Sequence, residues 1–97
     1  MLTNFTHSRK DLCSTFERKA IECTGALTEA RRLVAIRSYG TPLNQLITHT
    51  YDLFDEIDEI LLVLRADKDH EIFVKVAALY RQLEEIQSLI PRTQRGN

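Results

Sequence analysis

The chain has 97 residues, of which 43% are hydrophobic and 28% are charged, and its net charge is −1. This length and composition are typical of one globular domain with a single core, and they exclude a chain that is disordered throughout. The longest unbroken apolar run, residues 60–64, is far shorter than the roughly 18 residues of a membrane span, and the N-terminus has no secretory-signal pattern.

Charge is unevenly distributed along the chain. Residues 41–64 carry five acidic and no basic side chains, whereas residues 1–40 carry seven basic and four acidic ones, and residues 65–97 carry six basic and five acidic ones. The basic residues Arg31, Arg32 and Arg37 are too few to follow a phosphate backbone. Nucleic-acid binding is therefore not expected.

The first predicted element is a helix that begins near Ser8, after a short polar leader over residues 1–7. Ser8 and Asp11 form a weak variant of a helix-capping pattern, and apolar residues then recur every three to four positions up to Val34. Gly25 lies inside this segment and costs about 1 kcal/mol relative to alanine. Because a single glycine cannot close a helical hairpin, we expect one continuous helix.

Both cysteines lie on this first helix. Cys13 and Cys23 are separated by roughly 15 Å of helical rise, which is beyond disulfide reach. Two free thiols favour a reducing, cytoplasmic compartment.

Residues 39–42 form the clearest break in the chain. Gly40 suits a left-handed helix end, Thr41 is a good N-cap, and Pro42 suits the first position of a helix. The second helix is therefore expected to begin here and to run to about Leu64.

A polar connection over residues 65–69 follows, in which Asp67 or Asp69 is a candidate cap for the third helix. That helix is expected to continue to about Ile90, where Pro91 ends it, and residues 92–97 are expected to form a frayed tail.

The apolar stripes of the three segments match when the chain is folded back at its two breaks. Folding aligns Leu27 with Leu53 and Phe16 with Leu64 in the first hairpin, and Leu53 with Tyr80, Ile57 with Val76 and Ile60 with Phe73 in the second. We predict an all-α antiparallel three-helix bundle in which residues 1–97 form a single domain, helix 1 is long with an N-terminal overhang, and helices 2 and 3 form a hairpin. In this register Arg81 lies level with Asp52 and Lys75 level with Asp58, which would relieve repulsion along the acidic helix.

The acidic cluster of the second helix has a possible catalytic interpretation. Glu56-Ile57-Asp58-Glu59 is similar in spacing to the ExxE helices of all-α nucleotide pyrophosphohydrolases, a resemblance that implies a Mg-dependent enzyme. The third helix offers Glu84 and Glu85 without the matching acidic partner, so a solvated face is the preferred interpretation.

Two histidines have spacings that occur in metal sites. His70 follows Asp67 by three positions and His49 precedes Asp52 by three, but neither histidine lies on the core stripe. We expect surface histidines, with no metal, no cofactor and no catalytic residue. A phosphate-binding glycine loop and a nucleophile elbow are both missing from the sequence.

The segment Gly40-Thr41-Pro42-Leu43-Asn44-Gln45-Leu46-Ile47 resembles the downstream half of the phosphoacceptor box in the dimerisation domain of sensor histidine kinases. The resemblance implies a histidine-phosphotransfer or dimerisation scaffold. The position of that family's phosphorylated histidine is occupied here by Arg37, so the scaffold would be degenerate.

Several apolar residues are not used by the predicted bundle. They lie on the overhang of helix 1, in the last turn of helix 2 or off the inner stripe of helix 3: Phe5, Leu12, Cys13, Leu62, Val63, Val74 and Leu89. Exposed apolar clusters commonly mark association sites. The preferred hypothesis is a non-enzymatic interaction module, such as an adaptor, a chaperone-like protein or a regulator, that dimerises or docks a helical protein through these residues.

Overall fold

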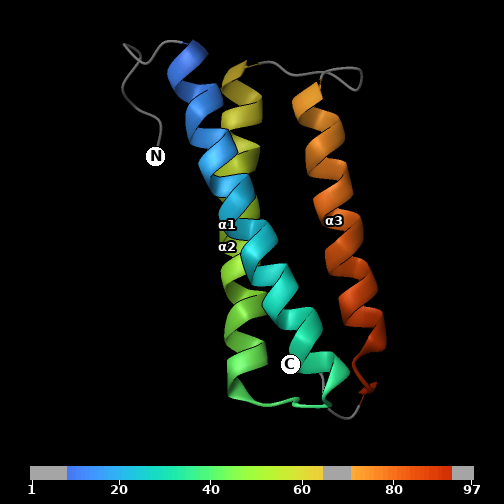
Figure 1. Cartoon of the computed structure of the whole chain (residues 1–97). Helices are drawn as coiled ribbons and strands as arrows, with labels where there is room; N and C mark the ends of the chain where they lie inside the picture. The colour runs from blue at the N-terminus through green and yellow to red at the C-terminus, as the bar shows by residue number, and fades with distance from the viewer. Residues whose placement is uncertain (1–8, 65–70, 93–97) are drawn as a thin grey trace.

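The computed structural model describes residues 9–64 and 71–92, and within them the chain is helical with no strand. Helix α1 spans Arg9–Ala35, α2 spans Thr41–Leu64 and α3 spans Glu71–Leu89. Successive helices run in opposite directions, so the start of α1, the end of α2 and the start of α3 lie at the same end of the molecule (Figure 1). The predicted antiparallel three-helix bundle is confirmed.

Helix α1 passes through Gly25 without a break, as expected. Gly25 is exposed, and no atom lies within 4 Å of the position that a Cβ would occupy. The glycine therefore weakens the helix without making room for a neighbouring group.

The C-terminus of α1 is closed by a Schellman motif. The N–H of Ser38 donates to the carbonyl of Leu33 at 2.8 Å, and the N–H of Arg37 donates to the carbonyl of Val34 at 3.0 Å. Arg37 occupies the left-handed position with φ 59°, and no described glycine has a positive φ. The prediction that Gly40 forms the left-handed end is wrong, because α1 already stops at Ala35 and the carbonyls of Leu33 and Val34 accept their hydrogen bonds from Ser38 and Arg37, before the chain reaches Gly40.

Helix α2 begins one residue earlier than predicted. The carbonyl of Gly40 accepts the first helical hydrogen bond, from the N–H of Asn44 at 3.2 Å, which makes Gly40 the N-cap. Thr41 and Pro42 therefore fill the first two helical positions, where the missing N–H of proline costs no intrahelical bond.

Helix α3 ends as predicted, directly before Ile90 and Pro91. The candidate caps Asp67 and Asp69 lie outside the described residues, as does the leader over residues 1–7.

The core consists of two adjoining clusters. One, at the end of the molecule where α1 begins, contains Leu12, Phe16, Ile57, Ile60, Leu64, Ile72 and Val76. The other contains Cys23, Leu27, Ala30, Leu33, Val34, Leu43, Leu53, Phe54, Leu79, Leu83, Ile86 and Ile90. The aligned pairs Phe16 with Leu64, Ile57 with Val76, and Leu27 with Leu53 each share a cluster, as the predicted register requires.

An aromatic contact joins the middle of α2 to the middle of α3. The rings of Phe54 and Tyr80 are stacked, with centroids 3.9 Å apart. Phe54 is fully buried, whereas Tyr80 and Phe73, both predicted to face inward, are 36% and 37% exposed. Helix α1 contacts both other helices more extensively than they contact each other, so positions between α2 and α3 are only partly covered.

One apolar residue expected to project from the bundle is instead part of its core. Leu12 is 5% exposed and belongs to the same cluster as Leu64 and Ile72. Its expected exposure is wrong because the last turn of α2 and the first turn of α3 pack around it.

Candidate interaction surface

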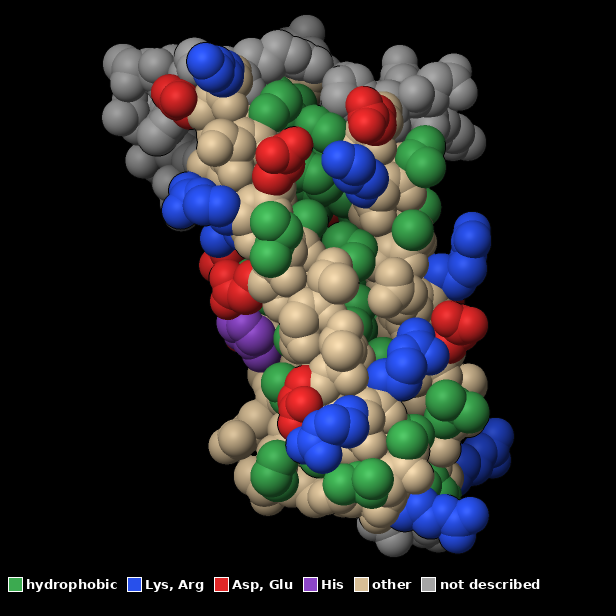
Figure 2. Space-filling view, in the orientation of Figure 1, with side chains coloured by type: hydrophobic (Ala, Val, Ile, Leu, Met, Phe, Trp, Pro, Cys, Tyr) green, Lys and Arg blue, Asp and Glu red, His purple; other side chains and the backbone are tan. Residues whose placement is uncertain are grey.

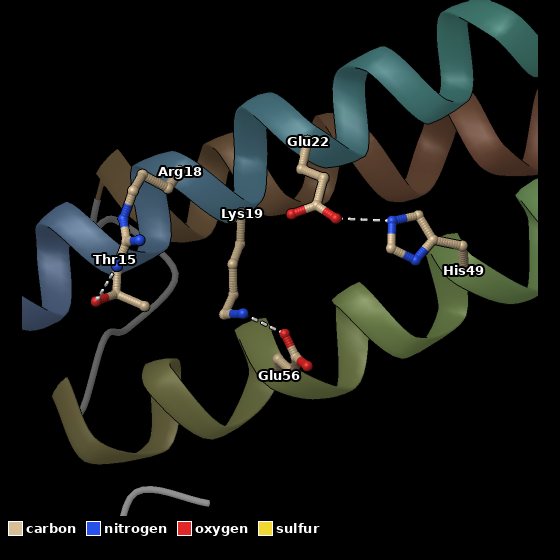
Figure 3. Close-up of polar contacts among 6 residues, drawn as sticks. All are labelled: Thr15, Arg18, Lys19, Glu22, His49 and Glu56. Carbon is tan, nitrogen blue, oxygen red and sulfur yellow. Dashed lines mark hydrogen bonds and ion pairs between the residues drawn. The ribbon is translucent and has the colours of Figure 1, made fainter.

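Polar contacts close the edge between α1 and α2 (Figure 3). Lys19 of α1 forms an ion pair with Glu56 of α2, and Glu22 lies 2.8 Å from Nε2 of His49. All four side chains are partly exposed, and such pairs contribute about 0 to 1 kcal/mol each. Their main consequence is geometric, because they show which edge of α2 faces α1.

Only part of the acidic charge on α2 is balanced within the described part of the chain. Lys19 pairs with Glu56, and Asp58 accepts a hydrogen bond from the hydroxyl of Tyr80 at 3.1 Å. The predicted contacts of Lys75 and Arg81 with α2 do not form: Lys75 instead lies 4.0 Å from Glu71, and no described ion pair links α2 to α3.

The carboxylates of α2 also do not converge with other ligands. Among residues 9–64 and 71–92, no three His, Cys, Asp or Glu side chains come together in a way that could hold a metal ion. His49 contacts Glu22 rather than Asp52, and the pair His70 and Asp67 lies outside the described residues. Arg37, the position that corresponds to the histidine of the phosphoacceptor box, lies in the turn after α1.

The two thiols have different environments. Cys23 has no exposed surface, and its burial, together with the nearby Glu22 carboxylate, raises the pKa of its thiol to about 11. Such a thiol is unreactive. Cys13 is half-buried and helps to line a hollow of about 200 Å³ between α1 and α3, together with Phe16, Glu17, Glu71, Ile72 and Lys75. Hydrophobic side chains are visible in this part of the face (Figure 2), but the hollow is smaller than the roughly 300 Å³ of a typical ligand pocket.

Four residues of the predicted association surface are exposed. Leu62 is exposed over 78% of its surface, Val63 over 51%, Val74 over 57% and Leu89 over 56%. The first three lie in the last turn of α2 and the first turn of α3, at the same end of the bundle, and we call them the end patch; they do not share one face, because the adjacent residues Leu62 and Val63 point about 100° apart on α2. Leu89 lies at the other end of α3, and Phe5 is outside the described residues.

A second group of partly exposed side chains lies between α2 and α3, and only some of its members were expected on the surface. The hydroxyl of Tyr51 accepts a hydrogen bond from Gln87 at 2.8 Å, and Tyr80 bonds to Asp58. Burial of Tyr80 and its bond to Asp58 raise the pKa of the tyrosine hydroxyl to about 12. Tyr51 was not singled out from the sequence, although its seven-residue separation from Asp58 places both on one face of α2.

We use the name α2–α3 seam for this second group and the residues that continue it along each helix. Its members are Tyr51, Asp55, Asp58 and Leu62 of α2, and Phe73, Tyr80, Glu84 and Gln87 of α3.

None of the helices in the described ranges combines the length and the hydropathy that a bilayer crossing demands. No family model matches the chain, and no curated protein and no solved structure shows significant similarity to it.

Proposed function

We propose that this chain is a non-enzymatic helical interaction module, a small adaptor, chaperone-like protein or regulator, that associates with a helical partner or a second copy. The observation that carries the proposal is the end patch, in which Leu62, Val63 and Val74 are each more than half exposed. Burying a leucine or valine side chain stabilises an assembly by about 1.5 to 3 kcal/mol. Three such side chains at one end of a rigid bundle suit association better than solvation.

The arrangement of the helices supports the same proposal. Each of the three side chains lies on a well-formed helix and points away from a core that is already filled by other residues. A helical partner would recognise such a patch with apolar side chains spaced three and four residues apart. The free thiols of Cys13 and Cys23 support a cytoplasmic location for this association.

The test is a comparison of two surface variants of the full chain. In the first, Leu62→Ser, Val63→Ser and Val74→Ser are combined. In the second, Ile21→Ser replaces an apolar residue on α1 that is 73% exposed and does not belong to the end patch. Circular dichroism checks that both remain helical.

Each tagged protein is produced in the cells of its native source and purified from them. Light scattering then measures the mass of the purified species. We expect the wild type and Ile21→Ser to recover a partner, or a second copy, in a simple stoichiometric ratio, and the triple variant to lose it. A wild type that is monomeric at high concentration and recovers no partner would refute the proposal, as would a triple variant that behaves like Ile21→Ser.

A further inference from the structure

We propose that the α2–α3 seam takes a basic amphipathic helix of a partner protein, which would lie along the seam as a fourth helix. This inference deepens the proposed function and rests on it. The occupant it names is a helix with one apolar face flanked by lysine or arginine side chains.

The first step concerns which way the seam faces. On α2, His49 and Glu56 contact α1. Tyr51 and Asp58 follow them by two positions each, and two positions on an α-helix correspond to a rotation of about 200°. The seam residues of α2 therefore lie on the edge opposite the one that α1 covers.

The second step concerns the length and regularity of the seam. Its α2 members recur at intervals of four, three and four residues, from Tyr51 to Leu62, and its α3 members Phe73, Tyr80 and Gln87 recur every seven residues. Each set follows one face of its helix. Eleven residues of α2 span about 16 Å and fourteen of α3 about 21 Å, which is enough to contact a partner helix over three to four turns.

The third step concerns apolar surface. Tyr51 is 46% exposed, and Phe73, Tyr80 and Leu62 add three more partly exposed apolar side chains along the same seam. Phe54 lies beneath Tyr80 and anchors its ring by stacking. Large aromatic side chains held in place on a partly open seam are the residue types that dominate helix-binding interfaces.

The fourth step concerns charge. Asp55, Asp58 and Glu84 lie along the seam, and none of the eight seam residues is basic. Within the described residues, the carboxylates of Asp55 and Glu84 form no ion pair or side-chain hydrogen bond. A second copy docked seam to seam would oppose like charges, whereas a basic helix would neutralise them.

The test uses a defined probe with the full chain. The probe is a fluorescent peptide of about 18 residues, built of leucine and lysine with leucine at helical spacing, and its binding is followed by anisotropy at about 150 mM salt. The control probe has glutamate in place of every lysine. We expect the lysine probe to bind and the glutamate probe to bind at least tenfold more weakly.

Two double variants locate the binding site. Asp55→Asn combined with Glu84→Gln removes two seam charges, whereas Asp52→Asn combined with Glu85→Gln removes two charges from the same helices outside the seam. Asp52 lines a shallow surface with His49, and Glu85 lies 3.9 Å from Arg31 of α1. We expect the seam variant to bind the lysine probe about tenfold more weakly and the control variant to change affinity less than twofold.

Equal weakening in both double variants, or equal binding of the two probes, would overturn the inference. A chain that does not bind the lysine probe but still recovers its partner from the native source refutes the seam assignment and leaves the proposed function standing. A chain that neither binds the probe nor associates with a partner or a second copy refutes both.

Discussion

The glycine inside α1 offers a direct test of the helix that organises the bundle. Gly25 lies sixteen residues after the start of α1 at Arg9 and ten before its end at Ala35. Replacing it with alanine adds a methyl group to a position where no atom lies within 4 Å, so the change creates no clash and no new packing contact. Only backbone conformational preference changes, partly through a more restricted unfolded chain.

Alanine is favoured over glycine in a helix interior by about 1 kcal/mol. We therefore expect Gly25→Ala to raise the free energy of unfolding by about 1 kcal/mol, and to raise the melting temperature by roughly 4 to 8 °C for a domain of this size. Urea unfolding followed by circular dichroism measures the first quantity, and a thermal scan measures the second.

Ala78→Gly provides the reciprocal control, because Ala78 is exposed in the interior of α3. It should lower the free energy of unfolding by about 1 kcal/mol, and the double variant should return close to the wild-type value because the two sites are independent. A Gly25→Ala protein that is no more stable than the wild type, or less stable, would show that α1 is not a continuous helix through this position.

Three further predictions follow from the described geometry. Arg37→Gly should raise the free energy of unfolding by about 1 kcal/mol in urea titrations, because glycine adopts the left-handed conformation without the penalty of a side chain; an unchanged value would contradict the Schellman assignment. In the native protein Cys13 should react with a thiol reagent, whereas Cys23 should react only as fast as the chain unfolds. Rapid labelling of two thiols would contradict the burial of Cys23. Burial favours the neutral thiol of Cys23 in the folded state, so its stabilising contribution is complete below pH 9 and is lost as the pH rises through 11. Titration of Cys23 should lower the free energy of unfolding by about 2 kcal/mol over that interval. Cys23→Ala should remove this part of the decline, whereas the part that comes from the raised pKa of Tyr80 should remain.

The helical bundle could be predicted because its signals are local and redundant. Apolar residues at helical spacing define one stripe on each helix, and the break at residues 39–42 combines glycine, threonine and proline in adjacent positions. The details of that break could not be predicted, because residue preferences favoured Gly40 for the left-handed turn. Two backbone hydrogen bonds to Leu33 and Val34 outweigh the unfavourable conformation that they impose on Arg37.

The exposed surface could be predicted only where a residue lies far from the core stripe. Leu62, Val63 and Val74 satisfy that condition and are exposed. Phe73 and Tyr80 lie at the edge of the stripe, and their exposure depends on how closely α2 and α3 approach, which no pattern within a single helix specifies. For this reason the aromatic side of the α2–α3 seam emerges only from the three-dimensional packing.

Hydrogen exchange of the complex formed with the partner recovered from the native source would test the interaction surface most directly. We predict that the partner slows amide exchange in the last two turns of α2 and the first three turns of α3, and leaves the outer face of α1 around Ile21 unchanged. Slowed exchange confined to α1, or none in either α2 or α3, would contradict an association surface at this end of the bundle.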